Sequence, residues 1–435
     1  MNMKTSRYNV CIPMQGVSLI YNCRTDEIIQ ADERLVDVYK LNMDHPEAIE
    51  QIAPDFYRYL CDKGFVLEDE IDEIQLILNG WKQEDKYGKD LFVTVNPTMN
   101  CNLKCYYCYE EHNKGTRMSQ EILDAVVAYF KWQIQSKKYN QIALSFFGGE
   151  PLIYFKKTVY PLLEEIRQLL DGKTIFSLHF TTNATLLTKK VLEYLKPWNP
   201  SFQITIDGNE FIHNLVKQLP GEKSAYKIAV NNIRLLLQQK LKVAIRFNYT
   251  AKTLDYFYDV LTDMQDFSDL EKSYCNINFH RIWQDTVIPD SELKDSVDAL
   301  EKAFREKGFH VISSSSRTIG RCYGDKENSV VINYNGAIYK CTARNFDEEH
   351  CEGQLLPDGN IKWNERYEKR KNVRYCNAVC QACLIFPLCH GGCSQNKLES
   401  DNPDKCLTQF SNQDKQDYIL RRIKDIYKEQ NRETI

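Results

Sequence analysis

The stretch LFVTVNPTMNCNLKCYYC, residues 91–108, places three cysteines just after a short apolar run. Cys101, Cys105 and Cys108 are separated by three residues and then by two. Two clustered thiols would suggest a redox pair and four a closed metal site, whereas three thiolates hold three irons of a cube and leave the fourth iron open. The spacing therefore predicts an iron-sulfur site with a free position at which a small molecule binds.

The apolar run at 91–98 is the first of six that recur with amphipathic segments between them. The runs are LFVTVNPT, IALSFFGG, FSLHFTTN, SFQITIDG, KVAIRFNY and NINFHRIW, and helices are expected at 119–137, 158–170, 188–196, 225–240, 253–265 and 291–307. Strands that alternate with helices imply parallel pairing, and runs this apolar imply burial on both faces of a sheet. We therefore expect an α/β fold, a partial (β/α)6 TIM-like barrel, with its chemistry at the carboxyl ends of the strands.

The chain has 435 residues, more than one hydrophobic core usually supports, which predicts two or three domains. Its formal net charge is -4 with both signs interspersed, so no basic stripe favours a nucleic-acid partner. No apolar run is long enough to span a membrane and the first residues lack an export signal, so we expect a soluble cytoplasmic protein with no membrane partner. Sixteen cysteines in such a chain indicate reduced thiols that bind soft metals.

The C-x3-C-x2-C spacing, together with GGEP at the end of the second run, resembles the radical S-adenosylmethionine (SAM) enzymes. The resemblance implies that Cys101, Cys105 and Cys108 ligate a [4Fe-4S] cluster whose open iron binds SAM. It also implies contacts of Tyr107 with the adenine and of Gly148, Gly149 and Glu150 with the SAM ammonium. Contacts with the ribose or carboxylate would come from Asn183, Thr205, Asp207 and Arg246. The family pattern after IDG often ends in His, Asp and Arg, whereas this chain has His213, Asn214 and Lys217.

The same resemblance implies radical chemistry. A reduced cluster passes one electron into the SAM sulfonium, which leaves a 5'-deoxyadenosyl radical that abstracts hydrogen from an unactivated carbon. An external low-potential electron donor such as flavodoxin or ferredoxin is then required. The sequence identifies no catalytic acid or base.

Nine further cysteines lie between Cys322 and Cys406. Their layout resembles the SPASM extension of radical SAM peptide maturases, which implies two auxiliary [4Fe-4S] clusters. One would be held by Cys380, Cys383, Cys389 and Cys406, and the other by Cys322, Cys341 and Cys393. The fourth ligand of the second cluster is open between Cys351, Cys376 and a substrate thiolate, and a zinc ribbon is the alternative use of the C-x2-C pair. The stretch NYNGAIYKC predicts a hairpin with Asn335-Gly336 as its turn.

The N-terminal pattern resembles the winged-helix peptide recognition element fused to maturases of ribosomally synthesised peptides. It predicts strands at 16–22, 28–32 and 65–69, a helix at 33–41 and a longer helix at 46–63. Such a module takes the leader segment of a precursor peptide as an added strand. A winged helix also suits DNA binding, but the acidic stretch at 68–73 argues against a phosphate partner.

We therefore divide the chain into a winged-helix-like peptide recognition module (1–88), a radical SAM partial barrel (89–310), a SPASM auxiliary-cluster domain (311–410) and a C-terminal helix (411–435). The favoured function is a peptide maturase that forms a carbon-carbon or thioether crosslink. An anaerobic sulfatase-maturating enzyme, which makes formylglycine, is the second hypothesis, although that group usually has Asp where this chain has Thr342. The third is a non-catalytic iron-sulfur scaffold that binds peptide.

Overall fold

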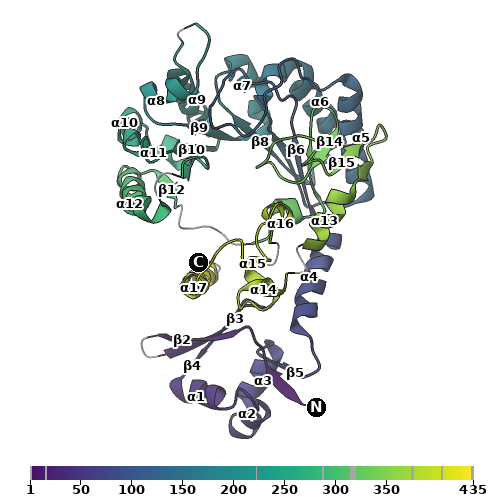
Figure 1. The fold of residues 1–435 in the computed structure, drawn as a ribbon, viewed down its shortest axis with the longest axis vertical. Coiled ribbons are helices and arrows are strands. Elements are labelled where there is room, and N and C mark those ends of the chain that lie inside the picture. The colour runs from purple at the N-terminus through teal and green to yellow at the C-terminus, as the bar shows by residue number, and fades with distance from the viewer. Residues whose placement is uncertain are drawn as a thin grey trace. The chain divides into compact units, whose positions relative to one another are not determined.

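The computed structural model describes residues 2–14, 17–221, 223–286, 289–313, 320–373, 377–402 and 405–432. The chain divides into two compact units, and each is described by itself (Figure 1). The larger unit comprises residues 89–318 and 327–368, and the smaller unit comprises residues 1–88, 319–326 and 369–435. The four-part division by function stays a prediction, and in packing the C-terminal segment shares a unit with the N-terminal residues.

The larger unit is built on a mainly parallel sheet. Its parallel strands are β6 (Asp90–Val95), β7 (Gln141–Phe146), β8 (Ile175–Thr182), β9 (Ser201–Ile206), β10 (Val243–Tyr249), β11 (Cys275–Arg281) and β12 (His310–Ile312). Each of the six predicted apolar runs is one of these strands, and sequence order equals spatial order from β6 to β12. The predicted partial barrel of parallel strands is confirmed.

Helices connect these strands and lie on the outer side of the curved sheet (Figure 1). At the six predicted positions are α5 (Gln120–Ser136), α6 (Tyr160–Leu169), α7 (Lys189–Leu195), α9 (Ala225–Gln238), α10 (Phe257–Asp263) and α12 (Asp290–Glu306). Ser119 caps α5 by accepting a hydrogen bond from the backbone N–H of Ile122, as its residue type predicts. Two short helices, α8 (Glu210–Val216) and α11 (Asp269–Ser273), were not predicted.

Aromatic side chains pack between the sheet and the helices that cover it. Phe146, Phe180 and Phe202 come from neighbouring strands, are fully buried and stack with ring centroids 5.1 and 5.6 Å apart. On the next pair of strands, the ring of Phe247 packs edge-to-face on that of Phe279, with centroids 5.1 Å apart. Each buried ring contributes roughly 1.5–3 kcal/mol. The packing fixes the strands so that their carboxyl ends, which carry the motifs, meet at one edge.

A hairpin extends the barrel sheet on the other side of β6. β13 (Ser329–Ile332) pairs parallel to β6 and antiparallel to β14 (Ala337–Tyr339), and β15 (Gly353–Leu355) and β16 (Ile361–Trp363) complete the sheet. The predicted hairpin is confirmed, with Gly336 in the left-handed conformation (φ 78°) that favours glycine. Its pairing with β6 was not predicted, and this pairing brings the segment after β14 close to the cysteine loop.

The smaller unit begins with two small sheets and four helices. These are β1 (Met3–Thr5), β2 (Asn9–Met14), β3 (Val17–Asn22), β4 (Glu27–Ala31), α1 (Glu33–Leu41), α2 (Glu47–Ile52), α3 (Pro54–Asp62), β5 (Val66–Glu68) and α4 (Glu73–Tyr87). The prediction of one continuous helix over 46–63 was wrong. The chain leaves the helical conformation at Ala53 (φ -146°, ψ 75°), because the ring of Pro54 disfavours the helical region for the residue before it. β1, β2 and α4 were not predicted.

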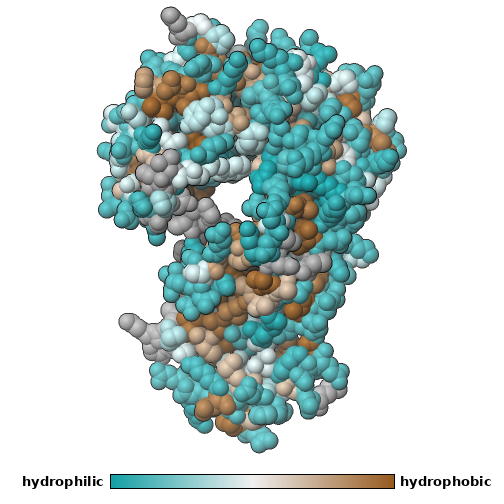
Figure 2. Space-filling model, in the orientation of Figure 1, coloured by the Kyte–Doolittle hydropathy of each residue, from teal (hydrophilic) through white to brown (hydrophobic). Residues whose placement is uncertain are grey.

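The cysteine-rich C-terminal segment completes the smaller unit. Its helices are α14 (Ala378–Gln381), α15 (Phe386–Cys389), α16 (Ser394–Leu398) and the predicted α17 (Asn412–Arg432), while α13 (Glu365–Val373) lies just before them. Ile419 and Ile423 of α17 are buried in one cluster with Tyr21 of β3 and Trp81 of α4. Figure 2 shows hydrophobic surface gathered in the part of this unit where α14 and α15 lie. None of the described helices is long and apolar enough to cross a membrane.

Candidate active site

The three-cysteine motif lies on an irregular segment, residues 97–119, between β6 and α5. Two glycines at the end of β7 allow the backbone of this segment to lie in close contact with the end of that strand. A Cβ on Gly148 would lie 2.7 Å from the Thr98 carbonyl oxygen, and one on Gly149 would lie 2.3 Å from that of Asn100. The backbone N–H of Gly149 donates to Thr98 at 3.2 Å. The structural role of this glycine pair is therefore to seat the cysteine loop, and its predicted contact with SAM stays a prediction.

Glu150, the acid that follows the two glycines, is fully buried behind the cysteine loop. Its carboxylate accepts hydrogen bonds from the backbone N–H groups of Leu152 (3.0 Å) and Asn183 (2.9 Å) and from the Thr182 hydroxyl (2.9 Å). Burial raises the pKa of Glu150 to about 7, and these hydrogen bonds oppose the rise. The side chain thus ties the ends of β7 and β8 together, while its predicted contact with the SAM ammonium stays a prediction.

A cleft of about 1020 Å³, including open solvent at its mouth, opens in front of the cysteine loop. Its lining contains Cys101, Cys105, Cys108, Tyr107, Gly148, Gly149, Asn183, Thr205 and Arg246. The structure therefore brings nine of the eleven residues predicted around the cluster and SAM to one cleft, and it places Glu150 and Asp207 behind the wall. Among the described residues no three metal-binding side chains converge as they would on a single ion. A four-iron cube requires less convergence, because each iron takes one cysteine.

Tyr107, which lies between two of the cysteines, is held by a buried polar network. Its hydroxyl donates to Asp207 at 2.5 Å and accepts from the ammonium of Lys217 at 2.8 Å. Lys217 also forms an ion pair with Asp207, and both residues are almost fully buried. Burial opposes the charge on Lys217, but Asp207 and Tyr107 raise the pKa of Lys217 well above its usual value. The network anchors the cysteine loop to the end of β9 and to the segment after α8.

His213 extends this network on the side away from the cysteine loop. Its Nδ1 atom accepts a hydrogen bond from the backbone N–H of Asp207 at 3.2 Å. Burial and the nearby charge of Lys217 lower the pKa of His213 to about 3, so the ring is neutral. No role was predicted for Lys217. The available signal was its spacing four residues after His213, which places both side chains on one face of a helix.

Several residues of the cleft lie outside every motif that the sequence analysis used. The ring of Tyr109 stacks on that of Trp283 with centroids 5.5 Å apart, and the Tyr109 hydroxyl donates to the Thr342 carbonyl at 2.7 Å. Gln284 donates to the backbone carbonyl of Tyr107 at 3.0 Å. Glu110 also lines the cleft, and burial raises its pKa to about 8. Tyr109 and Glu110 come from the cysteine loop and Trp283 and Gln284 from the segment after β11, which only the folded chain brings together.

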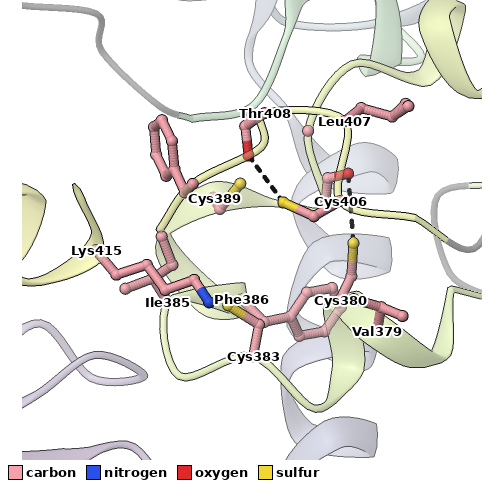
Figure 3. Close-up of a pocket in the computed structure, with 13 residues that line it drawn as sticks. Val379, Cys380, Cys383, Ile385, Phe386, Cys389, Cys406, Leu407, Thr408 and Lys415 are labelled. Atoms are coloured by element: carbon pink, nitrogen blue, oxygen red, sulfur yellow. Dashed lines mark hydrogen bonds between the residues drawn. The ribbon is translucent and has the colours of Figure 1, made fainter. Parts of the chain in front are cut away.

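A second cysteine site lies in the smaller unit (Figure 3). Cys380, Cys383, Cys389 and Cys406 line a pocket of about 470 Å³, and the other lining residues include Val379, Ile385, Phe386, Leu407 and Phe410. The Cys406 thiol is 3.2 Å from the Thr408 hydroxyl, and the buried ammonium of Lys397 donates to Cys380 Sγ at 3.7 Å. All four residues predicted to hold one auxiliary cluster therefore meet in one pocket.

The residues predicted for the other auxiliary cluster are divided between the two units. Cys322 and Cys393 belong to the smaller unit, and Cys341 and Cys351 belong to the larger unit. The Cys351 thiol donates to the Gly353 carbonyl at 3.2 Å, and Cys341 Sγ accepts from the backbone N–H of Ala343 at 3.3 Å. Cys376 lies outside the described residues. This ligand set stays a prediction.

Comparison with known proteins agrees with this site. Residues 95–260 match the model of the Radical SAM superfamily, so the chain carries a radical SAM domain. The chain shares its fold with two solved proteins. Polyhistidine-tagged anSMEcpe with bound AdoMet superposes with a TM-score of 0.56 at 18% identity and covers 73% of this chain and 93% of its own. Streptococcus suis SuiB bound to precursor peptide SuiA superposes with a TM-score of 0.52 at 15% identity, over 93% and 100% of the two chains.

A relative in sequence is the serine-type anaerobic sulfatase-maturating enzyme of Bacteroides thetaiotaomicron, which is 28% identical over 193 residues. The match covers 42% of this chain and 44% of that protein, so the chain spans less than half the length of that relative. These comparisons confirm the predicted radical SAM domain and the predicted fold class. The chain is therefore similar in sequence to an anaerobic sulfatase-maturating enzyme and in fold to anSMEcpe and SuiB.

Proposed function

We propose that this protein is a radical SAM peptide maturase that forms a carbon-carbon or thioether crosslink in a precursor peptide. The observation that carries the proposal is the three-cysteine loop, which opens into a large cleft of the radical SAM domain. A closed four-thiol site has no room for a ligand on iron, whereas a three-thiol site does. The SuiB structure with its precursor peptide SuiA supports a peptide as the substrate, because the two chains share a fold over most of their length.

The residues of the cleft fit a [4Fe-4S] cluster and SAM. Cys101, Cys105 and Cys108 would each bind one iron, and the bound pair of cofactors supplies a 5'-deoxyadenosyl radical that removes a hydrogen atom. Asn183 supports this assignment because its side-chain N–H lies 3.9 Å from Cys101 Sγ, where it would stabilise a thiolate. Arg246, whose Nε atom donates to Asn248 at 2.9 Å, offers a positioned cation for the SAM carboxylate.

The pocket of the smaller unit fits an auxiliary [4Fe-4S] cluster. Its four cysteines would give one thiolate to each of the four irons, and the other lining residues are mostly apolar. A second auxiliary cluster held by Cys322, Cys341 and Cys393 belongs to the same proposal. Such clusters would carry electrons between the radical site and a donor such as flavodoxin or ferredoxin. Iron quantitation after anaerobic reconstitution gives the cluster number directly.

The N-terminal residues are proposed to bind the leader segment of the precursor peptide. The described part of their antiparallel sheet has the order β2-β3-β4, so β2 and β4 are its edges. β2 carries Pro13, which has no N–H to donate, and β4 is therefore the better edge for an added strand. The expected partner is an extended peptide that pairs with Glu27–Ala31.

Maturation of a sulfatase is the second candidate function. It is favoured by the similarity to the Bacteroides thetaiotaomicron enzyme and to anSMEcpe. Against it stands Thr342, where the resemblance described above expects an aspartate after the cysteine. Labelling of the product with a hydrazide separates the two functions on peptides that contain a sulfatase-type Cys or Ser, because formylglycine carries an aldehyde and a crosslink does not. Mass alone does not separate them for Ser, since its oxidation to formylglycine also removes two hydrogens.

The decisive experiment uses protein that has been reconstituted with iron and sulfide and reduced without oxygen. Incubation with SAM is expected to yield 5'-deoxyadenosine, and turnover with the right precursor peptide is expected to lower the peptide mass by two hydrogens. A variant in which Cys101, Cys105 and Cys108 are all alanine is the control. If the fully loaded protein yields no 5'-deoxyadenosine, the maturase proposal is wrong and the non-catalytic scaffold is favoured.

A further inference from the structure

Glu110 is the only acidic residue among the described residues that line the cleft. Only 8% of its surface is exposed, and none of the described residues donates a hydrogen bond to its carboxyl or forms an ion pair with it. The carboxyl therefore faces the cleft from a desolvated position with no partner of its own. Buried polar groups in proteins are nearly always paired, so this exception needs a physical explanation.

Other buried acids of the larger unit are compensated. Glu150 accepts from two backbone N–H groups and a hydroxyl, Asp207 is paired with Lys217, and Glu301 is paired with Arg305 at 2.6 Å. An uncompensated buried carboxylate is unfavourable because it loses its hydration without gaining a donor. Glu110 is thus the acid in this unit whose partner the chain does not itself supply, and a bound ligand is the remaining source.

The surroundings of Glu110 indicate the chemistry of that ligand. Tyr109, the residue before it in the sequence, stacks on Trp283, which is 56% exposed, and both rings line the same cleft as Glu110. The three cations of the lining, Lys217, Arg246 and Arg281, come instead from the segment after α8 and from β10 and β11. A cleft that is lined both by an acid and by aromatic rings suits an alkylammonium, whose methylene groups pack on the rings while its N–H groups donate to the acid.

We propose that Glu110 binds a primary ammonium group in the cleft. The group belongs either to an amine-bearing side chain of the peptide, such as lysine, or to the amino acid part of SAM. This inference rests on the proposed function, because it assigns a ligand to the same cleft. It adds a specificity residue that no motif of the sequence marks.

The test compares Glu110→Gln with Glu111→Gln in anaerobically reconstituted holoenzyme. Glutamine keeps the shape of the side chain and removes its charge, and Glu111 is the exposed neighbour that does not line the cleft. Glu110→Asp keeps the charge on a shorter side chain. It serves as the second variant if the Glu110→Gln protein fails to fold. Iron content and circular dichroism establish that each variant is loaded and folded.

Two probes distinguish the sources of the ammonium. Saturation-transfer NMR with n-butylammonium and with neutral n-butanol reports on the peptide side, and dissociation constants of SAM and S-adenosylhomocysteine report on the cofactor side. Loss of a charged hydrogen bond is expected to weaken the binding of one ammonium probe by about tenfold or more in Glu110→Gln and not in Glu111→Gln. Weaker n-butylammonium binding assigns the peptide, and equally weaker binding of SAM and S-adenosylhomocysteine assigns the cofactor.

Three results would overturn the inference. They are unchanged binding of every probe, equal effects of the two substitutions, and a loss confined to SAM, which would mean that the acid faces the sulfonium. If the wild-type protein cleaves SAM and Glu110→Gln changes no binding constant, only this inference fails. If the wild-type protein does not cleave SAM, the proposed function fails as well.

Discussion

The two cysteine sites of this molecule differ in the number of thiols and in what surrounds them. In the larger unit three cysteines on an irregular loop open into a cleft lined by polar, charged and aromatic residues. In the smaller unit four cysteines line a smaller pocket whose other residues are mostly apolar (Figure 3). We therefore expect the three-thiol site, with its open polar cleft, to bind a substrate on iron, and the four-thiol site, with its mostly apolar lining, to hold a cluster that only transfers electrons.

The largest expected effect comes from removing one thiol of the three-cysteine site. Cys108→Ala should abolish 5'-deoxyadenosine formation, because the cube loses one of only three protein ligands. Chromatography of anaerobic reactions measures the product, and Cys61→Ala on α3 is the control that should keep full turnover. If Cys108→Ala forms 5'-deoxyadenosine at the wild-type rate, the three-cysteine site is not the one that binds and cleaves SAM.

The matching change in the smaller unit should have a different result. Cys389→Ala removes one of the four thiols in the apolar pocket and should lower the iron content by about one four-iron cluster. SAM binding and its basal reductive cleavage should remain, since the cleft of the larger unit is untouched. Iron quantitation and the SAM dissociation constant are the measurements. Loss of SAM binding together with the iron would show that the pocket is not a separate site.

The next prediction concerns the anchor of the cysteine loop. Lys217→Met leaves the Asp207 carboxylate buried without its cation, which should destabilise the folded state by about 3–5 kcal/mol. Lys227→Met breaks the exposed pair with Glu210 and should change stability by no more than about 1 kcal/mol. Thermal unfolding of the loaded proteins measures both. The double variant Asp207→Asn with Lys217→Met should recover part of the lost stability. If the stability losses of the two single variants simply add in the double variant, the two side chains are not coupled.

How well the sequence predicts these sites depends on how far apart in the sequence the contacting residues are. The strands and the cysteine loop were predicted because apolar runs and the three-cysteine spacing are local patterns. The pairing of β13 with β6, and hence the contact of Tyr109 with Thr342, joins segments more than 200 residues apart and leaves no local pattern. Glu110 and Trp283 were missed for the same reason. The break before Pro54 does have a local signal, the proline itself, but the helical pattern continues on both sides of it.

A smaller effect is expected at the pocket of the smaller unit. The buried ammonium of Lys397 donates to Cys380 Sγ, and a positive hydrogen-bond donor at a cluster ligand stabilises the reduced cluster. Lys397→Met should therefore lower the reduction potential of the cluster in this pocket and leave that of the other site unchanged. Redox titration followed by electron paramagnetic resonance measures both potentials. Lys424→Met on the exposed side of α17 is the control, and equal shifts in the two variants would refute the assignment.

The smallest expected effect is a pH dependence. Burial and Lys217 lower the pKa of His213 to about 3 in the folded state, below the value near 6.5 of the unfolded chain. The unfolded state therefore binds more protons between these values, and stability is lost as the pH falls from about 6.5, with a slope of at most about 1.4 kcal/mol per pH unit. In His213→Gln the midpoint temperature of unfolding should therefore depend less steeply on pH between about pH 7 and pH 5. An unchanged slope would mean that the ring titrates normally.

The most direct test of the account is whether SAM binds to an iron of the three-cysteine site. Electron-nuclear double resonance of the reduced protein with SAM labelled by ¹⁵N in its amino group and ¹⁷O in its carboxylate detects such binding. We predict couplings from both labels in the wild-type protein and in Cys389→Ala, and none in Cys108→Ala. Couplings that are absent from the loaded wild-type protein, or that persist in Cys108→Ala, would contradict the account.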